Sequence, residues 1–331
     1  MKKLLYISVA LCLVVVGCSK EKPVEEINDM PLALFPQLRQ VGTKAMLDNT
    51  TIEAENIRIQ VSKEDGSAYN ADAISTLSFS TPNWVLSKSL YLTHDFAQIY
   101  AYAPSVDPIS EEDGSFNTLK RWLDIPAIQD MSDQTDYLYS YQQYTTTSGT
   151  TKINSANPSV QLTLDHALTQ VAFVFYKTDF SGDGDIYSVK IKDLSAPSFI
   201  ISKSSGNDLA LKVADGTITG GETIDEIGVI NVGSTITLTA QPSLVANDLV
   251  QYINAYLLLT PVSIASKSNI QFTFNIDGRD YVASLTGTDV VNWEKGMQYI
   301  YTVKLAGTEL VIESVSVTPW NPKYEDEIVI N

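Results

Sequence analysis

Cys18 is the residue near the N-terminus whose surroundings indicate a defined chemistry. It directly follows the small residue Gly17 and closes an apolar run over residues 4–16, which begins behind a basic start and is too short to span a bilayer as a permanent helix. This order is typical of lipoprotein signal peptides, because the peptidase needs small side chains beside the cut and the cysteine thiol accepts the diacylglycerol. The sequence therefore predicts a signal peptide over residues 1–17 and lipidation at Cys18, with an ordinary cleaved signal as the alternative.

Metal-binding side chains are scarce in the rest of the sequence. The second cysteine, Cys12, lies in the predicted signal peptide, so no internal disulfide can form after processing. The two histidines, His94 and His166, are far apart, which argues against a zinc or copper site. His166 follows an alternating apolar stretch and is interpreted as a packed or capping residue. We predict no bound metal and no cofactor.

The stretch from Asp179 to Asp185 resembles the first half of a calcium-binding loop. Oxygen ligands stand at its first, third and fifth positions and Gly184 at the sixth. The twelfth position requires a glutamate, however, and Lys190 stands there with a charge that repels the ion. We interpret the stretch as a turn between strands, although its carboxylates exclude calcium less firmly than other metals.

The sequence holds no pattern that indicates an enzyme. It has no nucleophile-elbow motif of a serine hydrolase and no Walker or dinucleotide fingerprint. A glycosidase needs only two carboxylates, but the acidic groups at residues 111–113 and 225–226 stand beside glycine and serine in expected solvated loops. We therefore predict a protein that is not an enzyme.

A cluster of four tyrosines suggests a different chemistry, the stacking of aromatic rings on sugars. The cluster comprises Tyr137, Tyr139, Tyr141 and Tyr144. On a strand the first three share one face, which favours half-buried core residues over a glycan platform.

The net charge excludes one class of partner. The chain has 22 basic and 39 acidic residues and a net charge of −17, which becomes −19 when Lys2 and Lys3 leave with the signal peptide. Such a surface repels nucleic acid and anionic lipid, so we predict no nucleic-acid partner. The polar, charged residues 19–29 read as a tether, and their acidic residues favour exposure on the cell surface.

Alternating apolar and polar residues predict strands along most of the chain. Asp277-Gly278 predicts a two-residue hairpin turn, and only short stretches such as Leu244–Tyr256 suit a helix. The class predicted is an all-β sandwich. The expected strands include Ile57–Val61, Val160–Leu164, Val171–Phe175, Ile270–Ile276, Tyr281–Leu285 and Tyr299–Leu305.

Two halves of similar class are expected, because a Thr/Ser-rich stretch at residues 145–151 separates two strand-rich regions. A mature chain of roughly 310 residues suits two domains. The predicted organisation is a signal peptide at 1–17, a lipidated tether and propeptide at 18–39, an N-terminal β-sandwich at 40–157 and a C-terminal β-sandwich at 158–331.

Five segments taken in order resemble the fimbrillin-like family of Bacteroidales, the subunits of type V pili and related surface lipoproteins. They cover most of the chain from about residue 50, and no single one of them is specific. The segments are Ile99-Tyr100-Ala101-Tyr102-Ala103-Pro104, Asp136-Tyr137-Leu138-Tyr139, the strand–His-Ala-Leu–strand stretch Val160–Phe173, the W-x-x-G-x-x-Y-x-Y-x-V stretch Trp293–Val303, and Val315–Trp320.

The resemblance implies two tandem transthyretin-like β-sandwich domains and export as a lipoprotein. In many members a cut after an arginine releases an N-terminal strand, and a terminal strand of another subunit fills the groove left behind. Arg39 stands where such a cut would fall, although it also suits an arbitrary linker residue. The displaced segment would contain Leu32, Leu34 and Leu38. The donor strand would contain Ile328, Val329 and Ile330.

The function expected from these observations is that of a structural subunit or accessory component of a surface pilus, which supports adhesion. Its expected partners are other fimbrillin-like subunits, the outer membrane through the lipid anchor, and a host or microbial receptor or glycan. The alternative is a monomeric surface lipoprotein that binds a glycan or a host protein.

Overall fold

The computed structural model describes residues 29–38, 51–71, 73–105, 109–110, 115–142, 151–195, 197–202, 208–243, 246–307 and 309–319. The regular secondary structure of the described chain is almost entirely β-strand, as predicted. Its helices are short: α1 (Ala246–Leu249) and the 3₁₀ helices η1 (Thr51–Ala54), η2 (Phe116–Thr118), η3 (Val250–Tyr252) and η4 (Lys267–Asn269). Among the described residues, no helix has the length and apolar character needed to cross a membrane.

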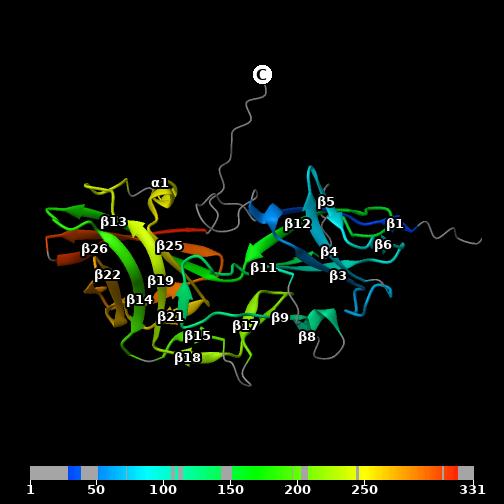
Figure 1. Cartoon of the computed structure of the whole chain (residues 1–331). Coiled ribbons are helices and arrows are strands. Elements are labelled where there is room, and N and C mark those ends of the chain that lie inside the picture. The colour runs from blue at the N-terminus through cyan, green and yellow to red at the C-terminus, as the bar shows by residue number, and fades with distance from the viewer. Residues whose placement is uncertain are drawn as a thin grey trace, which may run out of the picture.

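Strands of the two halves of the chain gather at opposite ends of an elongated molecule, and short strands run along one side between them (Figure 1). At one end lies a seven-stranded sheet in the order β2-β12-β11-β7-β3-β4-β5. Its edge strands β2 and β5 approach each other to within 8 Å between Cα atoms, so the sheet curls around its own core. The strands are β2 (Ala33–Leu38), β3 (Ile57–Ser62), β4 (Ile74–Ser80), β5 (Asn83–Leu86), β7 (Gln98–Ala103), β11 (Leu138–Gln142) and β12 (Ser159–His166).

The other end is a sandwich of two sheets. One has the order β20-β13-β25-β26 and the other the order β10-β19-β14-β22-β23. The first sheet contains β13 (Thr169–Thr178), β20 (Ala255–Leu259), β25 (Met297–Ala306) and β26 (Glu309–Pro319). The second contains β10 (Ile128–Asp130), β14 (Asp185–Asp193), β19 (Glu226–Thr235), β22 (Ile270–Ile276) and β23 (Arg279–Ser284).

Aromatic side chains hold the two sheets of this sandwich together. Phe173 on β13 meets Phe272 and Phe274 on β22 edge to face, with ring centroids 5.3 and 5.2 Å apart. Phe175 meets Phe274 in the same way at 5.1 Å. All four phenylalanines are fully buried, which explains the strict alternation of β22, whereas the central residues of β13 are apolar and buried on both faces.

The predicted hairpin between β22 and β23 is confirmed. Ile276 pairs with Arg279, and the two residues between them have positive φ, 51° at Asp277 and 76° at Gly278. Aspartate and glycine tolerate this conformation, which a two-residue turn with the right strand twist requires.

Short strands connect the two ends of the molecule. A sheet of order β17-β16-β9-β8 joins strands from both halves of the sequence, and β10 pairs in parallel with β19. The remaining pairs are β1 with β6, β15 with β18, and β21 with β24. The strands are β1 (Met30–Pro31), β6 (Tyr91–Leu92), β8 (Ile109–Ser110), β9 (Lys120–Trp122), β15 (Phe199–Ile201), β16 (Ala210–Lys212), β17 (Thr217–Thr219), β18 (Glu222–Ile224), β21 (Val262–Ile264) and β24 (Val291–Trp293).

The passage from the seven-stranded sheet to the sandwich falls between β12 and β13. β12 pairs with β2 and β11, and therefore completes the sheet of the first half. β13 pairs with β20 and β25 of the sandwich. The domain boundary expected after residue 157 stays a prediction, and the strand pairing itself changes sheets at Ala167-Leu168.

Candidate strand-exchange site

The N-terminal strand β2 lies at the edge of the seven-stranded sheet, in parallel register with β12. Leu34 pairs with Val160 and Leu38 with Leu164. Leu32, Leu34 and Leu38 are only 5, 5 and 1 % exposed. The apolar segment expected around residues 32–38 is therefore a strand packed on the first sheet.

Sequence and position of β2 agree on its being an edge strand. Pro36 cannot donate a backbone hydrogen bond, and proline within a sheet is found at edges. Phe35, on the opposite face from the leucines, is 52 % exposed. The strand thus buries one face and one backbone edge, and presents its other face to solvent.

Backbone hydrogen bonds fix the start of β2. The Leu32 amide donates to the Leu90 carbonyl at 2.8 Å, and the Ala33 amide donates to the Pro158 carbonyl at 2.9 Å. Further along, the Gln37 side chain donates to the Thr163 hydroxyl at 3.2 Å. Two separate segments, one at Leu90 and one at residues 158–163, therefore hold β2 in its groove on the first sheet.

Removal of β2 would open a groove suited to another strand. Its neighbour β12 would become the sheet edge, with a free row of backbone donors and acceptors. The side chains of Val160, Leu162 and Leu164, now fully buried, would lose their cover. An edge of this kind accepts a strand from another chain readily, because main-chain hydrogen bonds supply affinity and alternate pockets supply specificity.

The predicted processing and attachment residues lie outside the described part of the chain. These residues are Cys18, Arg39, and the donor residues Ile328, Val329 and Ile330. Arg39 follows Leu38, the last residue of β2, directly in the sequence. A cut there would separate β2 from everything that follows it.

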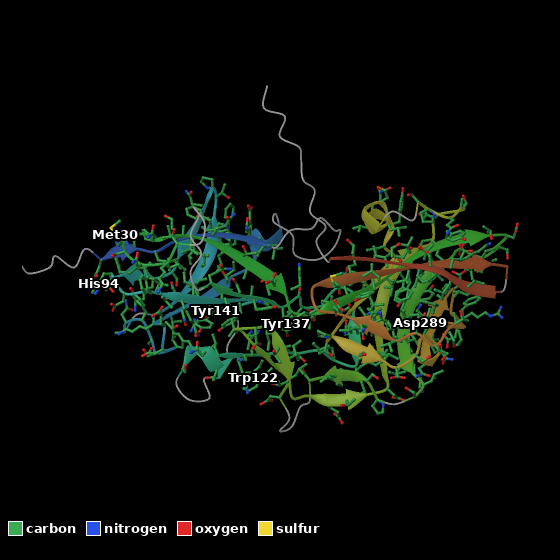
Figure 2. The ribbon with its side chains drawn as sticks, turned by 180° about the vertical axis from the view of Figure 1, so that it is seen from behind. Met30, His94, Trp122, Tyr137, Tyr141 and Asp289 are labelled. Atoms are coloured by element: carbon green, nitrogen blue, oxygen red, sulfur yellow. The ribbon has the colours of Figure 1, made fainter. Side chains whose placement is uncertain are left out.

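His166 is a packed residue, as interpreted from the sequence. Its Nδ1 lies 2.8 Å from a carboxylate oxygen of Asp136, and both residues are 4 % exposed. Burial, and then the nearby charge of Asp136, raises the pKa of Glu55. The pair ties the entry of β11 to the end of β12, where the chain leaves the first sheet. His94, the other histidine, is exposed at the far end near Met30 (Figure 2).

Two of the segments that carried the resemblance touch at this same junction. The Gly296 amide donates to the Leu168 carbonyl at 2.8 Å, and the Thr169 hydroxyl donates to the Glu294 carbonyl at 2.6 Å. Gly296 has φ +67°, a conformation that favours glycine. The turn between β24 and β25 is thereby held against the start of β13.

The tyrosine cluster belongs to the core and does not form a sugar-binding platform in the described part of the chain. Tyr137 and Tyr139 are 3 and 8 % exposed. Tyr141 is half-buried and stacks on the buried Tyr100 with ring centroids 4.8 Å apart. Tyr141 lies among strands of the first sheet in Figure 2, Tyr137 lies near the middle of the molecule, and Tyr144 is outside the described residues.

The calcium-like stretch is a turn whose hydrogen bonds come from the protein itself. The Asp277 carboxylate accepts from the Gly184 amide at 3.0 Å and from the Asp185 amide at 2.8 Å. The Asp185 carboxylate accepts from the Thr235 hydroxyl at 2.6 Å. Among the residues that the structure describes, no group of three metal-ligating side chains could hold a metal ion.

Asp277→Ala should lower the free energy of unfolding by about 1–3 kcal/mol, because it leaves two backbone donors of the turn without their acceptor. Asp183→Ala, which removes an exposed carboxylate of the same stretch, should change it by less than about 0.5 kcal/mol. Urea denaturation with and without added calcium measures both effects. Calcium stabilisation that the Asp183 substitution abolishes would contradict the turn interpretation.

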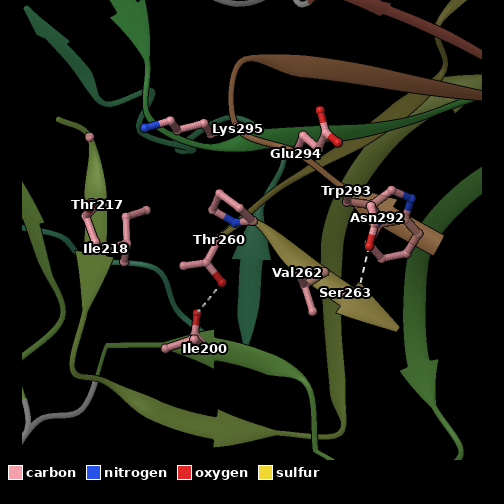
Figure 3. A pocket seen from close by; sticks show the side chains of 12 residues that line it. Ile200, Thr217, Ile218, Thr260, Val262, Ser263, Asn292, Trp293, Glu294 and Lys295 are labelled. Carbon is pink, nitrogen blue, oxygen red and sulfur yellow. Dashed lines mark hydrogen bonds between the residues drawn. The ribbon is translucent and has the colours of Figure 1, made fainter. Parts of the chain in front are cut away.

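A shallow pocket of about 500 Å³ lies between β17, β21 and β24 (Figure 3). The Thr260 hydroxyl donates to the Ile200 carbonyl at 3.3 Å, and the Ser263 hydroxyl donates to the Asn292 side chain at 2.7 Å. Trp293 borders the pocket but is only 1 % exposed, so its indole face is not offered for stacking. The lining is a mixture of polar and aliphatic groups.

Comparison with known proteins agrees with this architecture. Two solved structures, both of candidate cell adhesion proteins, are similar in fold at 14 % sequence identity. The one from Bacteroides uniformis has a TM-score of 0.57 and covers 88 % of this chain and 99 % of its own. The one from Bacteroides ovatus has a TM-score of 0.56, with coverages of 89 and 99 %. No curated protein matches the sequence at a significant level. The family model described as fimbrillin-like matches residues 43–320, and the chain therefore belongs to the fimbrillin-like family.

Proposed function

We propose that this protein is a subunit or accessory component of a cell-surface pilus that assembles by strand exchange and supports adhesion. Membership of the fimbrillin-like family supports a fimbrial or adhesion role at the cell surface. The observation that carries the finer proposal is β2, an apolar edge strand that ends directly before Arg39. In this proposal Cys18 holds the exported precursor at the outer membrane through its lipid.

A cut after Arg39 starts assembly in the proposed mechanism. While the chain is intact, β2 fills its own groove beside β12. After the cut β2 is held only by non-covalent contacts, and a strand from another subunit can replace it. The proposed donor is the segment with Ile328, Val329 and Ile330, whose apolar side chains alternate across both faces of an extended strand. Other fimbrillin-like subunits are the proposed partners.

Controlled cleavage tests this mechanism. Brief treatment of residues 19–331 with a trypsin-like protease should convert a monomer into oligomers that resist mild detergent, as measured by light scattering. Arg39→Ala together with Lys44→Ala should block both the cut and the conversion, because a trypsin-like protease also cleaves after lysine. Deletion from Tyr324 onward should leave the cut intact but prevent the conversion. If mass spectrometry confirms the cut after Arg39 and the protein stays monomeric at high concentration, strand exchange is not its mode of action.

A monomeric surface lipoprotein that binds a glycan or host protein is the second candidate. The pocket between β17, β21 and β24 is the observation that favours it, because its exposed hydroxyl, amide and carboxylate groups can hydrogen-bond a polar ligand. Persistent monomers after the cut, together with retention on a glycan array, would move this candidate ahead.

A further inference from the structure

A hydrophobic groove of about 730 Å³ runs along one edge of the sandwich, between β23 and β26. Its floor includes Tyr299 and Tyr301 of β25. Its walls carry five valines, each between 44 and 56 % exposed: Val282, Val290, Val311, Val315 and Val317. Exposed apolar side chains scattered singly are normal, but a contiguous set in one groove marks a surface that something covers.

Two valines of β26, Val315 and Val317, face inward and are nevertheless half exposed. Val315 pairs with Tyr301 and Val317 with Tyr299, so all four side chains stand on the same face of their sheet. The tyrosines are 2 and 7 % exposed because they pack inside the sandwich. β26 is the last strand of its sheet, and the facing sheet ends at β23. The two edge strands approach each other to within 8 Å between Cα atoms, and the groove follows the line along which they meet.

The backbone of β26 is a second reason to expect that another segment covers this groove. This strand has eleven residues and a strand partner on one side only, within the described part of the chain. Long edge strands are templates for unwanted pairing, and proteins usually protect them with charges. The charge of Glu313 turns to the protein instead, since the Tyr176 hydroxyl donates to it and Lys304 lies 3.9 Å away. Burial, and then the hydrogen bond and charge of Glu313, raise the pKa of Tyr176 to about 12.

We propose that residues 320–331 of the same chain turn back along β26 and fill this groove as an added strand. They are covalently joined to the strand that forms its wall, and such attachment gives a high local concentration. After a turn at residues 321–322, nine extended residues remain, and they reach about 30 Å along an eleven-residue strand of about 36 Å. Asn321-Pro322 provides a turn signal directly after β26.

The composition of this segment suits the groove. In an extended segment Tyr324, Asp326, Ile328 and Ile330 share the face that can point between the sheets, and three of these four side chains are aliphatic or aromatic. Glu325 and Glu327 point to the opposite face. The fimbrillin-like match ends at residue 320 and so assigns these residues no place. In the uncut subunit, the segment 320–331 would occupy the groove whether or not subunits later exchange strands. Where they do, the groove stores the donor and protects the edge until assembly.

Amide hydrogen exchange of the uncut protein tests the proposal. Removal of residues 321–331 should speed exchange in peptides from β26 by roughly tenfold or more, because an edge loses a hydrogen-bonded neighbour. Exchange in β3 should not change. A synthetic peptide of residues 320–331 should slow exchange in β26 again. Equal exchange with and without the segment would overturn the proposal.

Point substitutions distinguish residues 320–331 of the same chain from a second copy of the protein as the occupant of the groove. Val315→Lys with Val317→Lys should speed exchange in β26 of the full chain to the rate of the truncated chain, because two charges would have to enter the groove with the segment. Val85→Lys, at an equally exposed valine on β5, is the matched control and should leave β26 unchanged. Protection of β26 that rises with protein concentration in the full chain would show that a second copy covers the groove, and would also overturn the proposal.

Discussion

Replacement of His166 by alanine should lower the free energy of unfolding by about 3–5 kcal/mol, because it leaves the Asp136 carboxylate buried without its partner. The two side chains lie 2.8 Å apart, with 4 and 2 % of their side-chain surface exposed. Urea denaturation followed by circular dichroism measures the loss.

His94→Ala is the matched control for this prediction. It removes a histidine whose side chain is 82 % exposed and whose partner, Asp95, is also on the surface. Such surface pairs contribute little, so we expect a change below about 0.5 kcal/mol. The double substitution Asp136→Leu with His166→Leu should recover part of the loss, because no buried charge then remains. If His166→Ala is as stable as His94→Ala, the buried pair does not hold the junction.

Local features of the fold were predictable because their causes lie within a few residues. The alternation of Ile270–Ile276 predicts β22, and Asp277-Gly278 predicts the turn that follows. The stretch Leu244–Tyr256 shows the limit of such reasoning. Only residues 246–252 of it are helical in the described chain, and Tyr256 lies in β20, where it pairs with Ala172 of β13. Pairing within the sandwich outweighs the weak helical preference.

Contacts between distant segments were not predictable from one sequence. The leucines of β2 indicate an apolar strand, but nothing in their pattern selects β12, more than a hundred residues later, as its parallel partner. The same holds for β10, which pairs with β19 of the sandwich. The sequence predicts that His166 is packed, but it does not identify Asp136 as its partner. The partner becomes evident when β11 and β12 pair and bring Leu138 opposite His166.

Two charges placed under β2 should produce the effect of cleavage without a cut. Leu34 and Leu38 are 5 and 1 % exposed, and a leucine lost from such a site costs about 2–5 kcal/mol before any charge is buried. Burial of a carboxylate costs several kcal/mol more, so Leu34→Asp with Leu38→Asp should cause β2 to dissociate from β12. β2 is an edge strand near the chain end, and it can leave while the other sheets stay folded.

The groove that β2 leaves beside β12 should then bind a strand from a second subunit. In the proposed mechanism the double variant of residues 19–331 forms detergent-resistant oligomers without protease, and light scattering detects them. Phe35→Asp, on the same strand but 52 % exposed, should remain monomeric and as stable as the unmodified protein. Deletion from Tyr324 onward should return the double variant to a monomer. Global unfolding of the double variant would show that β2 is an inseparable part of the sheet, and a folded monomer with β2 released would show that the open groove does not recruit another subunit.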